Sequence, residues 1–160
     1  MPELRLGGVR EPDLHGIEMD PDRANQLRGS LPSADVRCGD APNLPWAAGE
    51  FGLVVSSTVF TSIVDHDRRT QIAAEITRVL KPGGALLWYD FAVRPNNPDV
   101  RAISRRTLVS LFPQLSGEIR RITLAPPLAR FVAPRSWLLA NALAAVPLLR
   151  THLMAVLVKK

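Results

Sequence analysis

The chain has 160 residues, of which 46% are apolar and 22% are charged, and this composition indicates a globular protein rather than a disordered segment. Its single cysteine, Cys38, excludes an internal disulfide framework and a zinc site made of cysteines. Charge is unevenly distributed, because residues 1–90 carry nine Lys or Arg against thirteen Asp or Glu, and residues 91–160 carry eleven against two. The basic side chains are scattered rather than interleaved with aromatic ones, which disfavours a nucleic-acid partner.

Two stretches bear on where the protein resides. Met1–Arg10 lacks the apolar core of a secretory signal, and we therefore expect a cytoplasmic protein. Residues 137–158 have about the length of a membrane-spanning helix, but Pro147, Arg150 and His152 divide the stretch into a helix and a strand. The sequence thus predicts no membrane span, and it predicts nothing about the oligomeric state.

The first half of the chain predicts alternating strands and helices. Its expected elements are a strand over residues 14–19, a helix over 21–29, strands over 34–38 and 51–56, a helix over 67–80 and a strand over 85–91. The first helix has a clear start, since Asp20 is a good N-cap and Pro21 fits the first helical position. The second helix ends at Lys81–Gly84, where proline removes a donor and glycine permits a positive φ. The apolar stretch at 51–56 is expected to be covered on both faces.

The second half of the chain is less regular. We expect a helix over residues 104–112, a strand over 117–124, an irregular stretch around Pro126, Pro127 and Pro134, a helix over 137–146 and a final strand over 151–158. Strands that alternate with helices and are nearly continuously apolar predict an α/β fold, namely a Rossmann-like, mostly parallel sheet with helices on both faces. We expect residues 1–160 to form a single domain of this kind.

Two carboxylates follow the carboxyl ends of predicted strands, where open α/β sheets bind ligands. Glu18 ends the first strand and could accept hydrogen bonds from the two hydroxyls of a ribose, a device that dinucleotide-dependent oxidoreductases also use. Asp40 follows the next strand and could accept a hydrogen bond from an adenine amino group. Each also has a plainer interpretation, Glu18 as a solvated acid at a helix entry and Asp40 as a turn residue after Gly39.

Four motifs in a fixed order resemble the class I S-adenosylmethionine-dependent methyltransferases. They are Gly-Ile-Glu-Met-Asp-Pro at residues 16–21, Cys-Gly-Asp-Ala at 38–41, Phe-Gly-Leu-Val-Val at 51–55 and Arg-Val-Leu-Lys-Pro-Gly-Gly at 78–84. The resemblance covers residues 14–91, and residues 149–157 resemble the closing antiparallel strand of such domains. It implies a sheet that ends in an antiparallel strand and an enzyme that transfers a methyl group to a small-molecule acceptor.

The resemblance also assigns roles to individual residues. S-adenosylmethionine is the implied cofactor, with Glu18 holding its ribose and Met19 lying beside its adenine. Asp40 and Ala41 match the pair of residues at the adenine edge. Ser56 matches a strand-end residue whose backbone lies near the methionine moiety. Residues 78–84 are structural in the family.

Catalytic residues are not identified by the sequence. His66 could deprotonate an acceptor, although a histidine between two aspartates at a helix start is more commonly a capping or surface residue. Tyr89 and Asp90 end a strand at the ligand edge and could contact a substrate. Neither His15 nor His152 has the partner spacing of a metal site, so we expect no metal.

The front of the chain departs from the family pattern. Such domains open with a strand and a Gly-x-Gly-x-Gly loop, about twenty to thirty residues before the ribose acid. Here only Leu6–Val9 resembles that loop, too close to Glu18, and Met1–Arg10 fits better as the tail of the helix after it. The resemblance therefore implies an N-terminally truncated domain that binds its cofactor poorly as given. A non-catalytic remnant acting as a binding module is the alternative, whereas residues 81–84 and Asp40 disfavour a nicotinamide-dependent oxidoreductase.

The basic second half suggests the chemistry of the acceptor. Arg94, Arg101, Arg105 and Arg106 follow the strand that ends at Asp90, and segments at this place line the acceptor side in the family that the chain resembles. The planar fork of arginine suits phosphate and carboxylate groups, so an anionic acceptor is expected. The alternative is that these arginines only solubilise an apolar helix.

Overall fold

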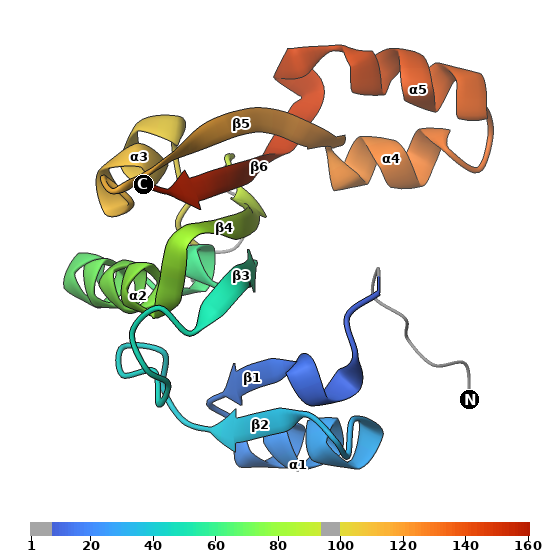
Figure 1. Ribbon diagram of the computed structural model, residues 1–160. Coiled ribbons are helices and arrows are strands. Elements are labelled where there is room, and N and C mark those ends of the chain that lie inside the picture. The colour runs from blue at the N-terminus through green and yellow to red at the C-terminus, as the bar shows by residue number, and fades with distance from the viewer. Residues whose placement is uncertain (1–7, 94–99) are drawn as a thin grey trace. The chain divides into compact units, whose positions relative to one another are not determined.

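The computed structural model describes residues 8–93 and 100–160 (Figure 1). The chain divides into two compact units, residues 1–45 and residues 46–160. The first unit carries a sheet of two strands and the second a sheet of four, each combined with helices, so the predicted α/β class is confirmed. The expectation of a single domain over residues 1–160 stays a prediction.

The first unit is a βαβ arrangement. After a 3-10 turn (Glu11–Asp13), strand β1 (His15–Glu18) leads into helix α1 (Pro21–Ser30), and strand β2 (Asp35–Cys38) follows. The two strands pair in parallel, with Glu18 opposite Cys38. Helix α1 begins as predicted, because the Asp20 side chain accepts hydrogen bonds from the backbone N–H groups of Asp22 and Arg23 at 2.9 and 3.2 Å.

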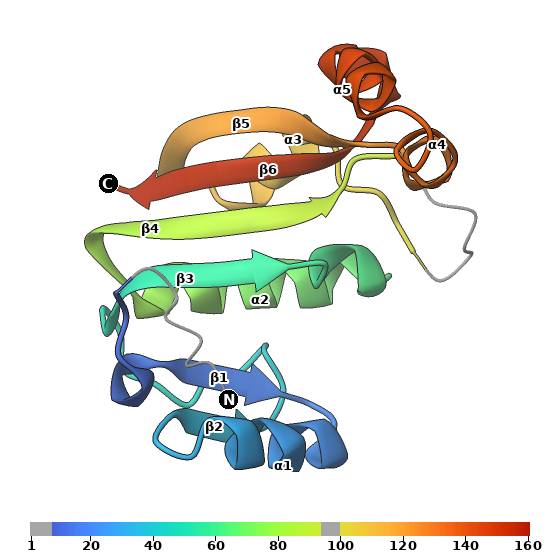
Figure 2. The same ribbon diagram turned by 90° about the vertical axis from the view of Figure 1, so that its right-hand side faces the viewer.

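The second unit is built around a four-stranded sheet. Its elements are β3 (Phe51–Ser57), a 3-10 turn (Phe60–Ser62), α2 (His66–Val79), β4 (Leu80–Phe91), α3 (Arg105–Leu111), β5 (Leu115–Leu124), α4 (Pro126–Val132), α5 (Trp137–Ala145), a 3-10 turn (Pro147–Leu149) and β6 (Arg150–Lys159). The strand order is β3-β4-β6-β5 (Figure 2). Strands β3 and β4 are parallel, whereas β6 runs antiparallel to β4 and β5. The expected antiparallel C-terminal strand is therefore confirmed.

The core of the second unit lies between the sheet and helices α2 and α3, which occupy the same side of it (Figures 1 and 2). Leu86 and Trp88 of β4 are fully buried, as is Phe60 in the turn after β3. The rings of Phe60 and Phe112 meet edge to face with their centroids 5.8 Å apart. Burying a large apolar side chain of this kind stabilises the folded state by about 1.5–3 kcal/mol.

Strand β3 is not covered on both faces, so that prediction was wrong. Leu53 and Val55 are 54% and 62% exposed, whereas Ser56, on the opposite face of the strand, is buried. The apolar run was correctly identified as a strand, but helices cover one face of it. Among the residues that the structure describes, β1 pairs only with β2 and β3 only with β4, so each of these strands has one edge without a partner strand.

The Lys-Pro-Gly-Gly segment forms the start of β4 rather than a separate turn. Gly83 has a φ of +75°, which favours glycine over residues with a side chain. A Cβ atom added at Gly84 would lie 2.9 Å from the carbonyl oxygen of Lys81 and 3.0 Å from that of Phe51. Gly83 is therefore required by its backbone conformation, and Gly84 by the close approach of two carbonyl oxygens.

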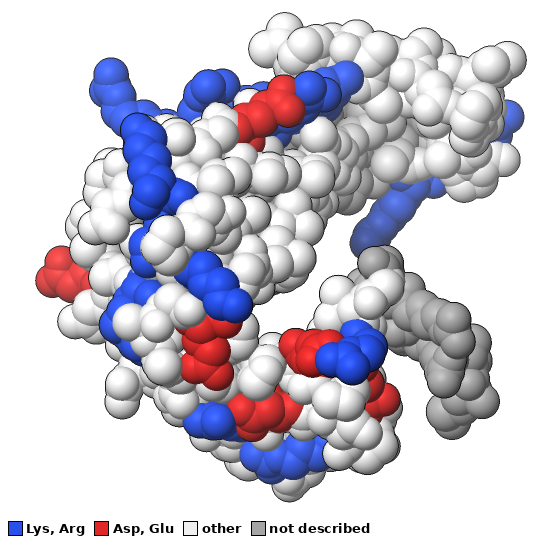
Figure 3. Space-filling model, viewed as in Figure 1, with Lys and Arg blue, Asp and Glu red and all other residues white. Residues whose placement is uncertain are grey.

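Helix α4 corrects the expectation of an irregular stretch around Pro126, Pro127 and Pro134. The first two prolines occupy the start of the helix, where a missing N–H group costs no hydrogen bond. Helix α5 follows as predicted, capped by Ser136, whose Oγ accepts a hydrogen bond from the N–H of Leu139 at 3.2 Å. Figure 3 shows that the surface over these two helices is almost entirely free of charge on the face in view.

Two further expectations concern a membrane span and a helix at the start of the chain. No helix within residues 8–93 and 100–160 is long and apolar enough to cross a membrane. The helix tail expected at Met1–Arg10 falls mostly outside the described residues, and its described part, Gly8 to Arg10, is not helical.

Candidate functional site

The parallel pairing of β1 and β2 brings two predicted ligand residues to one edge of the first unit. Glu18 is the last residue of β1, and Asp40 lies two positions beyond the last residue of β2. The N–H of Gly39 donates to the carbonyl oxygen of Glu18 at 3.0 Å, so the two strand ends are directly joined. Both carboxylates thus follow the carboxyl ends of neighbouring parallel strands, where open α/β sheets bind ligands.

The backbone fixes the orientation of the Glu18 carboxylate. Its Oε1 accepts a hydrogen bond from the N–H of Asp20 at 3.0 Å, and Asp20 in turn caps helix α1. The Glu18 side chain is half-buried, and its Oε2 receives no hydrogen bond from the described residues. A carboxylate held at one oxygen with the other available fits the hydroxyls of a ribose.

The neighbouring predicted residues are accessible. Met19 is 66% exposed, so its thioether can pack against a flat ring. Asp40 is exposed and Ala41 is half-buried. The loop that carries them begins with a tight turn, in which the N–H of Asn43 donates to the carbonyl oxygen of Asp40 at 3.2 Å.

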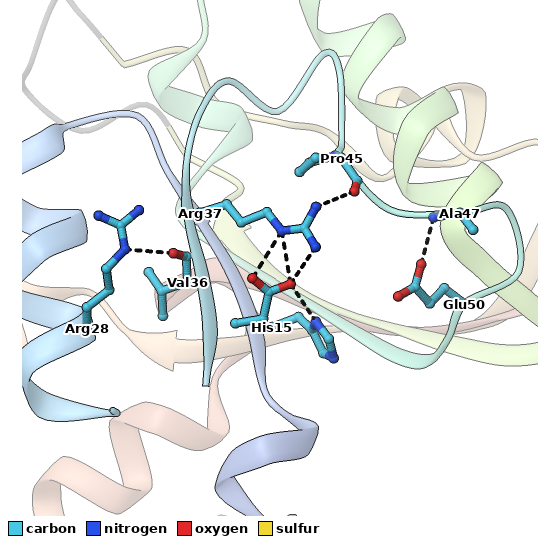
Figure 4. A network of polar contacts seen from close by, with 8 residues as sticks. His15, Arg28, Val36, Arg37, Pro45, Ala47 and Glu50 are labelled. Carbon is cyan, nitrogen blue, oxygen red and sulfur yellow. Dashed lines mark hydrogen bonds and ion pairs between the residues drawn. The ribbon is translucent and has the colours of Figure 1, made fainter. Parts of the chain in front are cut away.

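Arg37 fastens the end of that loop to β2 (Figure 4). Its Nη2 lies 2.8 Å from the Asp35 carboxylate on the same strand, and its Nη1 donates to the carbonyl oxygen of Pro45 at 2.6 Å. His15 of β1 approaches the same Asp35 carboxylate through Nδ1 at 3.3 Å. The loop with Asp40 is therefore anchored at its start by β2 and at its end by this cluster of side chains.

In the second unit, Ser56 lies near the carboxyl end of β3. It is buried opposite Trp88 of β4, and the Ser56 Oγ and Trp88 Nε1 atoms have no hydrogen-bond partner among the described residues. The role expected for Ser56 concerned its backbone, and it stays a prediction.

Backbone strain in the second unit converges on Tyr89. The non-glycine residues with positive φ within the described ranges are Thr58 at 54° and Thr123 at 64°. The N–H of Thr58 donates to the carbonyl oxygen of Tyr89 at 2.8 Å, and the Thr123 hydroxyl lies 3.0 Å from the Tyr89 hydroxyl. Such conformations cost about 1–3 kcal/mol each and cluster at functional sites. Tyr89 is therefore the better supported of the two predicted substrate contacts on this strand.

The sequence indicates no metal-binding role for His152, but the structure places this residue beside Tyr89. Its ring stacks on that of Tyr89, with centroids 4.9 Å apart and planes 1° from parallel, and lies 4.1 Å from the ring of Phe91. Burial lowers the pKa of His152, which favours the neutral imidazole. The antiparallel register that sets Phe91 opposite His152 produces this cluster, and no local sequence signal reveals it.

Asp90 is a structural residue, so its expected contact with a substrate was wrong. Its carboxylate is fully buried and accepts hydrogen bonds from the N–H groups of Thr61 and Phe91 at 3.2 and 3.0 Å, and from the Thr61 hydroxyl. Burial raises the pKa of Asp90, with the hydrogen bonds opposing that rise. The residue ties the turn after β3 to the end of β4, beside Tyr89.

The remaining candidates lie on helices of the second unit. His66 is an exposed residue in the first turn of α2, whose N-cap is Asp65. Arg101, Arg105 and Arg106 are all exposed, and Arg105 donates from Nη1 to the carbonyl oxygen of Ile119 at 3.3 Å. Arg94 lies outside the described residues. Within the part of the chain that the structure describes, no cluster of His, Cys, Asp or Glu could hold a metal ion.

Comparison with known proteins identifies the family. The family model of a methyltransferase domain matches residues 5–88, half of the chain. The chain belongs to the methyltransferase domain family. The resemblance to class I S-adenosylmethionine-dependent methyltransferases is thereby confirmed, and S-adenosylmethionine is the cofactor that goes with this fold.

Individual relatives agree with this assignment. The chain is 40% identical over 72 residues to phthiotriol/phenolphthiotriol dimycocerosates methyltransferase 1 of Mycobacterium ulcerans (strain Agy99), a match that covers 45% of the chain and 25% of that protein. It is similar in fold to an S-adenosylmethionine-dependent methyltransferase of Methanosarcina mazei, with a TM-score of 0.66 at 14% identity over 93% of this chain and 84% of that one. A TehB-like methyltransferase of Corynebacterium glutamicum gives 0.63 at 20% identity, over 91% and 67%. The chain spans about a quarter of the length of the curated relative that it matches.

Proposed function

We propose that this methyltransferase domain binds S-adenosylmethionine through Glu18 and Asp40 and transfers its methyl group to a small-molecule acceptor. The observation that carries the proposal is the parallel pairing of β1 and β2, which sets both carboxylates at one carboxyl edge. When bound, the cofactor supplies an electrophilic methyl group on a sulfonium. The protein's part is then to hold and orient the two reactants, since positioning supplies much of the acceleration.

The residues of the first unit have distinct tasks in this proposal. Glu18 accepts hydrogen bonds from the ribose hydroxyls, and the N–H of Asp20 keeps the carboxylate in place for them. Met19 covers a face of the adenine. Asp40 accepts from the adenine amino group, and Ala41 lies at the adenine edge. Arg37 holds the far end of the loop that carries the last two residues.

Replacing Glu18 with alanine should weaken S-adenosylmethionine binding by about 1–3 kcal/mol, the scale for lost hydrogen bonds to a charged group. Isothermal titration of the protein with S-adenosylmethionine measures the change. The matched control is Glu118→Ala, which removes an exposed glutamate that pairs with Arg120 on β5. Unchanged affinity in Glu18→Ala, or an equal loss in the control, would remove Glu18 from the cofactor site.

The acceptor in this proposal is a small molecule with an anionic group. The relative from Mycobacterium ulcerans is named for phthiotriol and phenolphthiotriol dimycocerosates, which supports a small-molecule acceptor. The anionic group is supported by the position of α3. The N–H of Ile103 donates to the carbonyl oxygen of Phe91 at 2.9 Å, so Arg105 and Arg106 follow closely on the carboxyl end of β4, where Tyr89 lies.

The double variant Arg105→Ala/Arg106→Ala should bind inorganic pyrophosphate about tenfold or more weakly than wild type, since each charge-assisted bond contributes about 1.5–3 kcal/mol. Titration at low and high salt measures this, and Arg121→Ala, an exposed arginine on β5, is the control. Equal binding by wild type and double variant, or none by either, would indicate a neutral acceptor and arginines that only solubilise the helix.

A further inference from the structure

Helices α4 and α5 form a hairpin with uncovered apolar side chains. Helix α5 contains no charged residue, and none of its nine residues is buried. The side chains of Leu148, Leu138, Trp137 and Phe131 are 89%, 77%, 74% and 63% exposed. A helix that is apolar all round is expected inside a large core or in lipid, so this hairpin lacks the cover that its composition calls for.

The charged residues of the hairpin and of the sequence that follows it are all basic. Residues 119–160 contain seven Lys or Arg and no Asp or Glu. Arg130 and Arg135 are exposed, and the Arg135 guanidinium lies over the ring of Phe131, 4.2 Å from its centroid. The hairpin surface therefore combines large apolar side chains with adjacent positive charge.

We propose that the α4–α5 hairpin, residues 126–149, docks on the surface of an anionic lipid bilayer. Phe131, Trp137 and Leu138 enter the boundary between headgroups and acyl chains, where tryptophan is favoured. Arg130 and Arg135 bind lipid phosphates, which match the planar fork of arginine. A membrane span needs about 20 apolar residues, more than α5 has, so the hairpin lies in the interface and does not cross it.

The charge pattern favours a bilayer over a second copy of the hairpin. Two such hairpins facing each other would bring arginines together without any acidic residue to pair with them, which disfavours self-association. An anionic bilayer provides both the apolar cover and the opposite charge. The hairpin residues are not among those assigned to cofactor binding, and the proposal does not depend on methyl transfer.

Trp137 provides an intrinsic probe of docking, because Trp46 and Trp88 are buried. Adding vesicles of phosphatidylglycerol and phosphatidylcholine should shift the tryptophan emission of the whole protein to shorter wavelength, and the protein should sediment with the vesicles. The double variant Trp137→Ser/Leu138→Ser should partition about tenfold or more weakly, because it loses two large apolar contacts. Arg130→Glu should weaken partitioning several-fold and reduce its salt dependence.

The control is Val109→Ser, which removes an exposed apolar side chain from α3 and should leave partitioning unchanged. All replaced side chains are exposed, and circular dichroism verifies that each variant is folded. Equal sedimentation of wild type and the Trp137→Ser/Leu138→Ser variant would overturn the proposal. So would equal binding to pure phosphatidylcholine, or lipid-free dimerisation that this variant abolishes, since the latter assigns the surface to a second copy.

Discussion

Replacing Asp90 with alanine should lower the free energy of unfolding by about 2–4 kcal/mol. The buried carboxylate accepts hydrogen bonds from two groups of Thr61 and from the N–H of Phe91. Alanine leaves these donors without an acceptor, which costs about 1–3 kcal/mol for each unsatisfied buried group. This cost outweighs the free energy gained because a charge is no longer buried. Urea unfolding measures the loss. Asp67→Ala, an exposed aspartate of α2, is the control and should change stability by less than about 0.5 kcal/mol.

The pH dependence of the free energy of unfolding gives a second test of the contribution of Asp90. Burial raises the pKa of Asp90 above its ordinary value of 3.8, so the folded protein holds this proton more tightly than the unfolded chain does. As pH rises from 3.8 to the raised pKa, the contribution of Asp90 to stability therefore falls. Asp90→Asn does not titrate at this position. The stability of wild type relative to this variant should be highest below pH 3.8 and decline above it, and a rise with pH would contradict the direction of the pKa shift.

The sequence predicted the elements between residues 14 and 91 well, because their signals are local. Asp20 and Pro21 start α1, and α2 ends at Val79, just before Lys81–Gly84, as expected from the chemistry of caps and turns. Which faces of a strand are covered is not a local property. An apolar run such as Phe51–Ser57 has the same composition whether helices cover one face or both, and this is why the exposure of Leu53 and Val55 was missed.

The residues of the candidate site also differ in whether local sequence signals reveal them. The place of Glu18 and Asp40 at neighbouring strand ends could be predicted, since Glu18 ends one strand, Asp40 follows another, and parallel pairing brings strand ends together. Their contacts with the cofactor stay a prediction. The cluster around Tyr89 could not be predicted, because His152 reaches it through antiparallel pairing with a strand some sixty residues earlier in the chain. Asp90 was misjudged for a related reason, since its position at a strand end resembles that of a ligand residue, while its side chain points into the core toward Thr61.

Gly117→Ala is expected to destabilise the second unit by about 2–4 kcal/mol. The sequence placed Gly117 at the start of a strand, whereas it lies inside β5, paired with Leu157 of β6. A Cβ atom added there would lie 2.0 Å from the carbonyl oxygen of Val156. Side chains can move to relieve a clash, but a carbonyl oxygen in a strand moves only with its backbone, so the β5–β6 pairing must open locally.

Gly52→Ala is the matched control, because Gly52 also lies in a strand and a Cβ atom there meets nothing within 4 Å. That substitution should be neutral or stabilise by up to about 1 kcal/mol, since alanine restricts the unfolded chain more than glycine does. Urea unfolding of both variants gives the comparison. Equal stability of Gly117→Ala and Gly52→Ala would show that β5 and β6 do not approach as closely as the structure has them. It would also count against the contact between Thr123 and Tyr89, because the same β5–β6 pairing sets Ile122 opposite His152.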